Sequence, residues 1–354
     1  MSIEANSTVV LHFIPQDGIG GAEIAARSAT IDPGHSAHVH AMYKGLYTGA
    51  SAISNDRLTG SPAHTVWSCR SLKDAVSRVR QVNPDVIVFS LWRTFGAFLV
   101  TKVRFPQRKF VTFIHNERTS NLVDRVISHL MMAASDAIWV DSQATLDSRL
   151  GTPHLRAKGR VISLILMRPR AIAKSSSAPK FVYWGRLARQ KRLDRSIDLF
   201  AAVARHRQDA RFTLIGPDHG ELSALKQQAA RLGVADRVTF RGPGGREAIA
   251  REAEDASFFL QLSDHEGMAM GVVEALQLGL VPVVTPVGQM ASYCRDGVNA
   301  LIYDEPEAAA QRIRELLDNP SAFAAMSAAA IATFAGMPTY SEDVSRAARD
   351  LASV

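Results

Sequence analysis

Short apolar runs alternate with longer segments of helical periodicity along the whole chain, and this alternation predicts βαβ units with parallel sheets. Several expected strands are apolar on both faces, as in FFL at 258–260 and VPVV at 281–284, which is typical of a sheet covered by helices on both sides. The expected strands are 9–14, 37–42, 85–90, 110–115, 137–141, 160–165, 180–184, 211–216, 237–241, 257–262, 281–285 and 300–303. The expected helices are 21–30, 72–82, 94–104, 120–134, 143–149, 192–206, 220–232, 245–254, 268–279 and 305–317.

The pattern breaks near the middle of the chain, where residues 166–180 read LMRPRAIAKSSSAPK. Prolines, serines and scattered charge favour a linker, and 354 residues suffice for two domains. We therefore expect a Rossmann-like domain over 1–167, a linker over 168–180 and a second Rossmann-like domain over 181–335. The segment 336–354 is expected to form a last helix that packs back on the first domain. The carboxyl ends of the strands of both domains would face a shared cleft, where doubly wound sheets bind ligands.

The formal charge of +7 is unevenly placed, since residues 1–170 hold 20 Lys and Arg against 12 Asp and Glu, and the remainder hold 21 against 22. A solvated basic surface explains this excess, and so does attraction to an anionic membrane or a phosphorylated acceptor. The run KVRFPQRK at 102–109 fits a membrane-facing patch. The charge is not accompanied by a nucleic-acid-binding motif, so nucleic acid is not an expected partner.

The N-terminal sequence, the lack of a long apolar run and the presence of only two cysteines predict a cytoplasmic protein, peripheral on the inner face of a membrane if the basic charge binds lipid.

Two segments of the first half carry candidate chemistry at the ends of expected strands. Gly20 and Gly21 follow the first strand in DGIGGAE at 17–23, where glycines let backbone amides approach an anion at a helix N-terminus. A tight turn without a ligand is the alternative. His115 begins the sequence HNE at the end of strand 110–115, where it could bind a sugar hydroxyl or serve as a structural histidine.

Two segments of the second half carry stronger candidates. The loop GRLARQK at 185–191 follows a strand, and its cations Arg186 and Lys191 could neutralise a diphosphate, although a solvated basic turn has the same composition. Strand 257–262 leads into SDHEG, and a helix is expected from about Met268. Glu266 and Glu274 would then lie about 12 Å apart along a helix, a span that reaches from a hexose to a ribose with a diphosphate between them.

Taken together, these motifs resemble the retaining glycosyltransferase family 4, which belongs to glycosyl transferases group 1 and has the GT-B fold. The resemblance runs through most of the chain and is densest over 180–304. It rests on the motifs already described and on VTFRG at 238–242, GLVPVV at 279–284 and DGVN at 296–299.

The resemblance implies a role for each candidate residue. Arg186 and Lys191 would bind the diphosphate and stabilise the leaving nucleoside diphosphate, Glu274 would hold the ribose, and Glu266 would bind the transferred sugar. His115 would face the sugar near its anomeric centre. The remaining donor-binding positions would be amides at Gly20, Gly21, Gly267, Met268, Ala269 and Met270, with Gly216 and Arg241 near the base.

The chain departs from the family where Ala269 replaces a frequent glycine, and where the run GQMAS at 288–292 lacks the usual glutamate. The donor is expected to be a UDP-sugar first and a GDP-sugar second, and the acceptor a glycan or lipid-linked molecule in envelope or polysaccharide assembly. A DxD metal motif does not occur, so neither a metal nor another cofactor is expected. A sugar-nucleotide epimerase on the same fold and a non-catalytic nucleotide-sugar-binding protein remain open alternatives.

Overall fold

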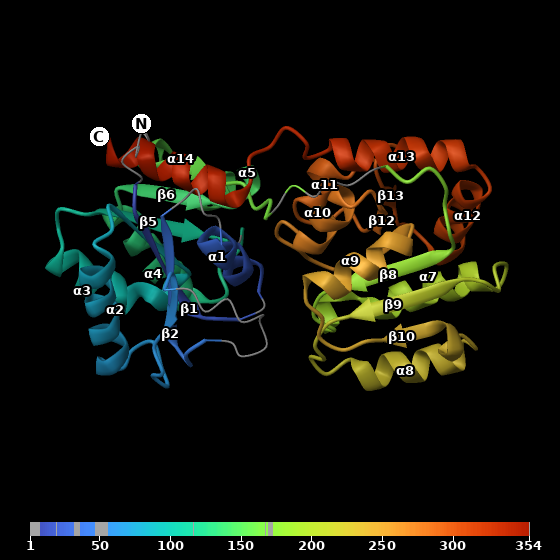
Figure 1. Cartoon of the computed structure of the whole chain (residues 1–354), viewed down its shortest axis with the longest axis horizontal. Helices are drawn as coiled ribbons and strands as arrows, with labels where there is room; N and C mark the ends of the chain where they lie inside the picture. Colours follow the sequence, from blue (N-terminus) through green and yellow to red (C-terminus); the bar gives the residue numbers. More distant parts are fainter. Residues whose placement is uncertain are drawn as a thin grey trace, which may run out of the picture. The chain divides into compact units, whose positions relative to one another are not determined.

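The computed structural model describes residues 8–18, 20–31, 36–46, 56–115, 117–166, 168 and 173–353. The chain divides into two compact units, which are 1–167 together with 338–354, called here the first domain, and 168–337, the second domain. Each domain contains one parallel β-sheet with helices packed against it (Figure 1). The predicted class of two doubly wound α/β domains is thereby confirmed.

The sheet of the first domain has the strand order β3-β2-β1-β4-β5-β6-β7, and all its pairings are parallel. The order reverses between β1 and β4, which are neighbours in the sheet but not in sequence. Loops that leave the carboxyl ends of two such strands diverge, and the space between them is where ligands bind in open α/β sheets. The strands are β1 (Val10–Gln16), β2 (Ala37–Tyr43), β3 (Leu58–Gly60), β4 (Val86–Ser90), β5 (Lys109–Ile114), β6 (Ala137–Val140) and β7 (Gly159–Val161).

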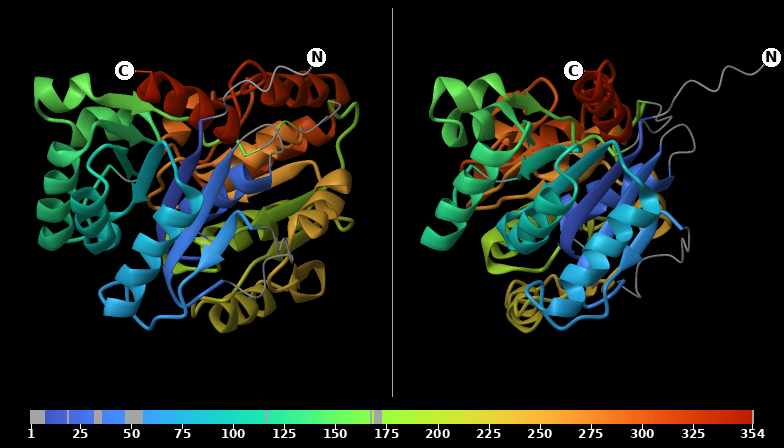
Figure 2. Two further views of the ribbon diagram at one scale, coloured as in Figure 1. Left: turned by 60° about the vertical axis from the view of Figure 1, so that its left-hand side comes forward. Right: turned by 90° about the vertical axis from the view of Figure 1, so that its left-hand side faces the viewer.

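Helices cover this sheet on both faces, and stacked aromatic rings such as Phe13, Phe89 and Phe110 fill the core beneath them. The last helix, α14 (Tyr340–Ala352), belongs to the first domain and contacts α1 and β4 (Figure 2). The other helices of this domain are α1 (Gly21–Ile31), α2 (Cys69–Val82), α3 (Phe95–Arg104), α4 (Leu122–Ala134), α5 (Gln143–Arg149) and α6 (Pro153–Ala157).

The sheet of the second domain has the order β10-β9-β8-β11-β12-β13, again parallel throughout, and its order reverses between β8 and β11. Its strands are β8 (Lys180–Trp184), β9 (Arg211–Ile215), β10 (Val238–Phe240), β11 (Phe258–Gln261), β12 (Val281–Val284) and β13 (Leu301–Ile302). Its helices are α7 (Leu193–Ala204), α8 (Leu222–Arg231), α9 (Arg246–Asp255), α10 (Met270–Gln277), α11 (Met290–Tyr293), α12 (Pro306–Leu317) and α13 (Pro320–Ala332).

The described second part of the predicted linker over 168–180 is hydrogen-bonded to the second domain. The Lys174 amide donates to Ser327 Oγ, and its ammonium donates to the carbonyls of Ala253 and Glu254. The Ala178 amide donates to Ser257 Oγ, which brings the chain directly into β8. The described part, from Lys174 to Ala178, is thus held by hydrogen bonds as it enters the second sheet, and residues 169–172 lie outside the described residues.

Three expectations need correction. Strand 160–165 ends at Val161, because the chain beyond it turns toward the last helix, where the Tyr340 amide donates to the Ile165 carbonyl. Helix α10 begins at Met270 rather than near Met268, because Ala269 has φ of 55°, in the left-handed region that an α-helix excludes. The short elements β3, α6 and α11 were not predicted. In the described part of the chain, none of the helices combines the length and apolarity needed to cross a bilayer.

Candidate functional site

The strongest candidates of the second domain meet where its strand order reverses. The loop after β8 carries Arg186 and Lys191, and the loop after β11 carries Glu266. A backbone hydrogen bond from the Asp264 amide to the Gln190 carbonyl, at 3.0 Å, joins the two loops. The carboxyl ends of all strands in a parallel sheet lie at one edge. Lys191 and Glu266 therefore lie together, although they are 75 positions apart in the sequence.

Glu266 is the centre of this cluster. Its Oε1 atom accepts from the Lys191 ammonium at 2.6 Å, from Ser263 Oγ at 2.6 Å and from Gln261 Nε2 at 3.0 Å. The Lys191 and Glu266 side chains are only 14% and 7% exposed, so a partly desolvated ion pair holds the carboxylate in place. None of the described residues donates to Oε2, which leaves this oxygen able to accept a hydroxyl of a ligand.

Arg186 differs from Lys191 in having no ion pair with another described residue. Its backbone is fixed, because its carbonyl accepts from Tyr183 Oη at 3.0 Å and from the Ala188 amide at 3.0 Å. A guanidinium that is half-buried and has its five donors available suits an anionic ligand with several oxygens.

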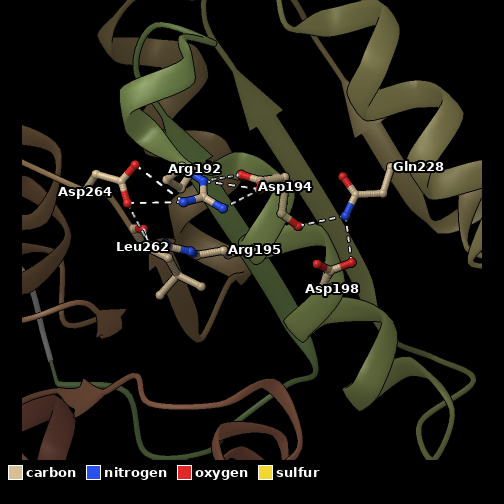
Figure 3. A network of polar contacts seen from close by, with 7 residues as sticks. All are labelled: Arg192, Asp194, Arg195, Asp198, Gln228, Leu262 and Asp264. Carbon is tan, nitrogen blue, oxygen red and sulfur yellow. Dashed lines mark hydrogen bonds and ion pairs between the residues drawn. The ribbon is translucent and has the colours of Figure 1, made fainter.

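The two loops are also tied together by an ion-pair network on α7 (Figure 3). Asp264 accepts from Arg192 at 3.2 Å and forms an ion pair with Arg195 at 3.0 Å, and Arg192 also pairs with Asp194 at 2.8 Å. Arg192 thus fastens the β11 loop beside the β8 loop. These contacts fix the position of the neighbouring Lys191 and Glu266.

Gly216 has a packing role that the sequence did not reveal. A Cβ atom at this position would overlap the Gly185 carbonyl oxygen, and φ of 156° is a conformation that other residues rarely adopt. Its amide donates to the Gly242 carbonyl at 2.8 Å. Beside it, the predicted base-binding Arg241 is 57% exposed and pairs with Glu252 of α9 at 2.7 Å. In this state Arg241 is therefore engaged by a protein carboxylate.

The segment between the two glutamates forms a loop and then one short helix. The described structure offers no acceptor to the amides of Gly267, Met268, Ala269 and Met270, which lie immediately before or at the start of α10. Free amides at this end of a helix attract anions. Because only the part from Met270 is helical, the estimate of 12 Å for an unbroken helix between the glutamates is wrong.

Glu274 lies on α10 and is held by an aromatic donor. Trp184 Nε1, at the end of β8, donates to Glu274 Oε2 at 2.8 Å. Burial raises the pKa of the Glu274 carboxyl, while the Trp184 hydrogen bond and the charge of Arg246 oppose that shift. The Oε1 atom has no donor among the described residues and is available to a hydroxyl group.

In the first domain, the glycine segment leads from β1 into α1. The carbonyl of Gly20 accepts from the Ile24 amide at 3.0 Å, and Gly21 is the exposed first residue of the helix. A Cβ at Gly20 would meet the Glu23 carboxylate, which is the end of a flexible side chain and can move aside. Asp17 pairs with Arg27 of α1 and closes the turn from the other side. Ile19 lies outside the described residues.

His115 follows β5 in the same domain and is held by hydrogen bonding and stacking. Its Nε2 atom lies 2.8 Å from Ser90 Oγ, at the end of β4, and its ring stacks on Phe113 at 4.2 Å. Burial lowers the pKa of His115 to about 3, so the imidazole is neutral at physiological pH. The buried Nδ1 atom has no hydrogen-bond partner in the described structure. Asn116 of the same motif lies outside the described residues.

Several residues that shape these sites were not predicted. Gln261 could have been found as the polar residue that ends an apolar strand, and Trp184 as the aromatic residue directly before Gly185. Ser90 and Ser263 could not have been identified in this way, because serine is common at strand ends. Groups of three or more metal-ligating side chains do not occur among the described residues.

Comparisons with known proteins agree with this architecture. Residues 168–333 match the family model of glycosyl transferases group 1. A GDP-mannose:cellobiosyl-diphosphopolyprenol alpha-mannosyltransferase of Xanthomonas oryzae is 30% identical over 139 residues, 38% of this chain and 36% of the relative. A D-inositol 3-phosphate glycosyltransferase of Streptomyces griseus is 36% identical over 110 residues, 30% of this chain and 23% of the relative. The matches thus span about a quarter to a third of these relatives.

Solved structures match over nearly the full chain. HepE of Anabaena in complex with UDP-glucose aligns with a TM-score of 0.74 at 19% identity, covering 98% of this chain and 99% of that one. A glycosyltransferase of Rickettsia africae aligns with a TM-score of 0.73 at 12% identity, covering 98% of each chain. The chain therefore has the GT-B fold, and its second domain matches glycosyl transferases group 1.

Proposed function

We propose that this protein is a retaining glycosyltransferase that moves a hexosyl group from a nucleoside-diphosphate sugar to a glycan or lipid-linked acceptor. The observation that carries the proposal is the Lys191–Glu266 pair, which joins the loop that carries Arg186 to the loop whose four amides have no protein acceptor. This arrangement offers positive charge and N–H donors for a diphosphate and carboxylate oxygens for sugar hydroxyls. HepE, which is similar in fold, is in complex with UDP-glucose, and this supports a nucleotide-sugar donor.

In the proposed reaction, Arg186 and Lys191 stabilise the charge that develops on the leaving diphosphate, together with amides before α10. Glu266 Oε2 accepts from a hydroxyl of the transferred sugar, and Glu274 Oε1 accepts from the ribose. For the neutral His115 of the first domain, the family resemblance predicts a contact with the transferred sugar near its anomeric carbon. Protein cations and amides supply the electrostatic stabilisation in this scheme, and we expect transfer to persist in the presence of a chelator.

The proposal is tested with a panel of nucleotide sugars. A donor at 100 times its dissociation constant is expected to add about 2.7 kcal/mol of stability in thermal unfolding, and a UDP-sugar is the first candidate. Incubation with acceptors should then release nucleoside diphosphate, and the anomeric coupling in the product should match that of the donor. Conversion of the donor sugar without acceptor would indicate an epimerase instead. Binding without release across a broad acceptor panel would indicate a non-catalytic protein.

Donor affinity is expected to depend on pH through Glu274. Burial raises the pKa of its carboxyl, so acidification protonates Glu274 at a higher pH than an ordinary glutamate. The protonated group loses accepting capacity for the ribose, and the dissociation constant of the donor should therefore rise as pH falls through this range. Titration calorimetry between pH 5 and 8 measures the change. In Glu274→Gln this component of the pH dependence should vanish, and its persistence would assign it to another group.

A lipid-linked acceptor is supported by one face of the first domain. On α4, Leu122 is 73% exposed, and Val123, Val126 and Leu130 are also exposed; on the neighbouring α3, Val103 is 83% exposed. The exposed cations Arg104, Arg118 and Arg125 accompany this apolar surface. Apolar side chains among cations fit the headgroup boundary of an anionic bilayer. Two such basic faces repel each other, which disfavours self-association.

Flotation with vesicles of anionic lipid tests this surface. The unmodified protein is expected to float with the vesicles and to be released by salt. In Leu122→Ser/Val126→Ser the bound fraction should fall by about tenfold or more, because each lost apolar contact removes roughly 1 kcal/mol or more of burial. A matched control, Leu232→Ser, changes an exposed leucine of the second domain and should float normally. Equal loss in both would contradict the proposed membrane face.

A further inference from the structure

A chain of hydrogen bonds links the C-terminal helix to His115 through the interior of the first domain. Tyr340 Oη lies 3.2 Å from His12 Nδ1, His12 Nε2 lies 2.6 Å from Ser90 Oγ, and Ser90 Oγ lies 2.8 Å from His115 Nε2. Tyr340, His12 and Ser90 are 1%, 4% and 0% exposed. The Tyr340–His12 and His12–Ser90 contacts are therefore shielded from water, and each proton position along the chain depends on the next.

Counting donors gives the chain a direction. Burial lowers the pKa of His12 and of His115 to about 3, so each ring carries one proton. If Tyr340 donates to His12, then His12 donates to Ser90, Ser90 donates to His115 Nε2, and the proton of His115 lies on Nδ1. In the opposite direction two buried groups, the Tyr340 hydroxyl and His115 Nδ1, have no partner among the described residues, whereas the first direction leaves only the Nδ1–H of His115 without one.

A bound ligand strengthens this preference. With the first direction, the one group left without a protein partner is the Nδ1–H of His115, and a ligand oxygen can accept from it. With the opposite direction, a ligand hydroxyl could donate to Nδ1, but the Tyr340 hydroxyl would still lack an acceptor. Burial raises the pKa of Tyr340, so its hydroxyl keeps its proton.

We propose that Tyr340 is a positioning residue that fixes His115 in the Nδ1–H tautomer. His115 thereby offers a hydrogen-bond donor, rather than a base, to an oxygen of the bound sugar. The sugar as ligand rests on the proposed function, whereas the tautomer is a property of the protein alone.

The start of α14 is built to hold Tyr340 in place. Thr339 and Glu342 form a capping box, in which the Thr339 amide donates to Glu342 Oε2 at 2.8 Å. The Tyr340 amide donates to the Ile165 carbonyl at 2.6 Å, and its ring stacks with Phe113, on which His115 also stacks. A helix far along the sequence thus reaches the end of β5 through contacts within one domain.

The test is Tyr340→Phe, read by nitrogen-15 spectra of the histidine rings in the ligand-free protein. Loss of the hydroxyl is expected to shift His115 from the Nδ1–H form toward a mixture, and to lower kcat/KM for the donor about 2- to 10-fold. Thr112→Val is the matched control, because it removes a buried hydroxyl from β5 that contacts Ser135 instead. It should leave the His115 tautomer unchanged.

Ser90→Ala supplies a second test by interrupting the chain. If Tyr340 affects the His115 tautomer through Ser90, adding Tyr340→Phe to Ser90→Ala should cause no further change in that tautomer. An unchanged tautomer in folded Tyr340→Phe, or full additivity in the double variant, overturns the inference. A shifted tautomer supports it even if His115→Ala leaves transfer intact, a result that would instead remove His115 from the proposed function.

Discussion

Replacing Lys191 by alanine is expected to slow glycosyl transfer by about 10²–10³-fold, corresponding to about 2.7–4 kcal/mol of lost transition-state stabilisation, by analogy with removal of one oxyanion donor. The ammonium is close to Glu266 Oε1 and only 14% exposed, so a diphosphate beside it would feel a charge that water screens weakly. Arg186→Ala should have an effect of the same order. Steady-state rates of nucleoside diphosphate release measure both.

Loss of Lys191 also leaves Glu266 with two neutral donors, Ser263 and Gln261, so the fold must be checked separately. Thermal unfolding and circular dichroism of each variant provide this check. Lys180→Ala is a matched control in the same domain, because its ion pair with Asp255 is largely exposed and contributes about 0–1 kcal/mol. Normal turnover in both Arg186→Ala and Lys191→Ala would exclude the proposed diphosphate site.

Replacing Gly288 by alanine is expected to lower the free energy of unfolding by about 3 kcal/mol and to reduce donor binding strongly. The added Cβ would overlap the Glu266 carbonyl oxygen and lie 2.8 Å from that of Gly267, and φ of 55° adds strain. A left-handed alanine costs about 1–2 kcal/mol and overpacking about 1–3 kcal/mol. Relief of the collision requires the loop that carries Glu266 to move. Denaturant unfolding and donor titration measure the two effects.

Gly297→Ala separates the collision from the strain. Its φ of 69° is similarly left-handed, but an added Cβ would meet nothing within 4 Å, so a loss of about 1 kcal/mol is expected with normal donor binding. If both variants lost the same free energy of unfolding and bound donor equally well, the close approach of Gly288 to the Glu266 loop would contribute nothing to stability or binding.

Much of the architecture could be read from the hydrophobic pattern, because each strand of a covered parallel sheet must be apolar and each helix must present an apolar face. The backbone conformations and contacts near the ends of these elements were harder to predict from the sequence. Ala269 shows why, since its left-handed backbone ends the loop and delays α10, although alanine itself favours helix. Composition likewise does not reveal that the segment before Lys180 is hydrogen-bonded to the second domain through Lys174 and Ala178.

Hydrophobic periodicity was enough to predict two doubly wound α/β domains, and residue types identified candidate cations, carboxylates and glycines after particular strands. Those choices follow from periodicity and from residue chemistry, which are local properties. The tertiary structure decided which of these groups meet: Lys191 with Glu266, and Trp184 with Glu274. It also decided that Arg241 pairs with Glu252 and that Tyr340 reaches His12. Such pairings depend on strand order and helix docking, because these bring together residues that lie far apart in the sequence.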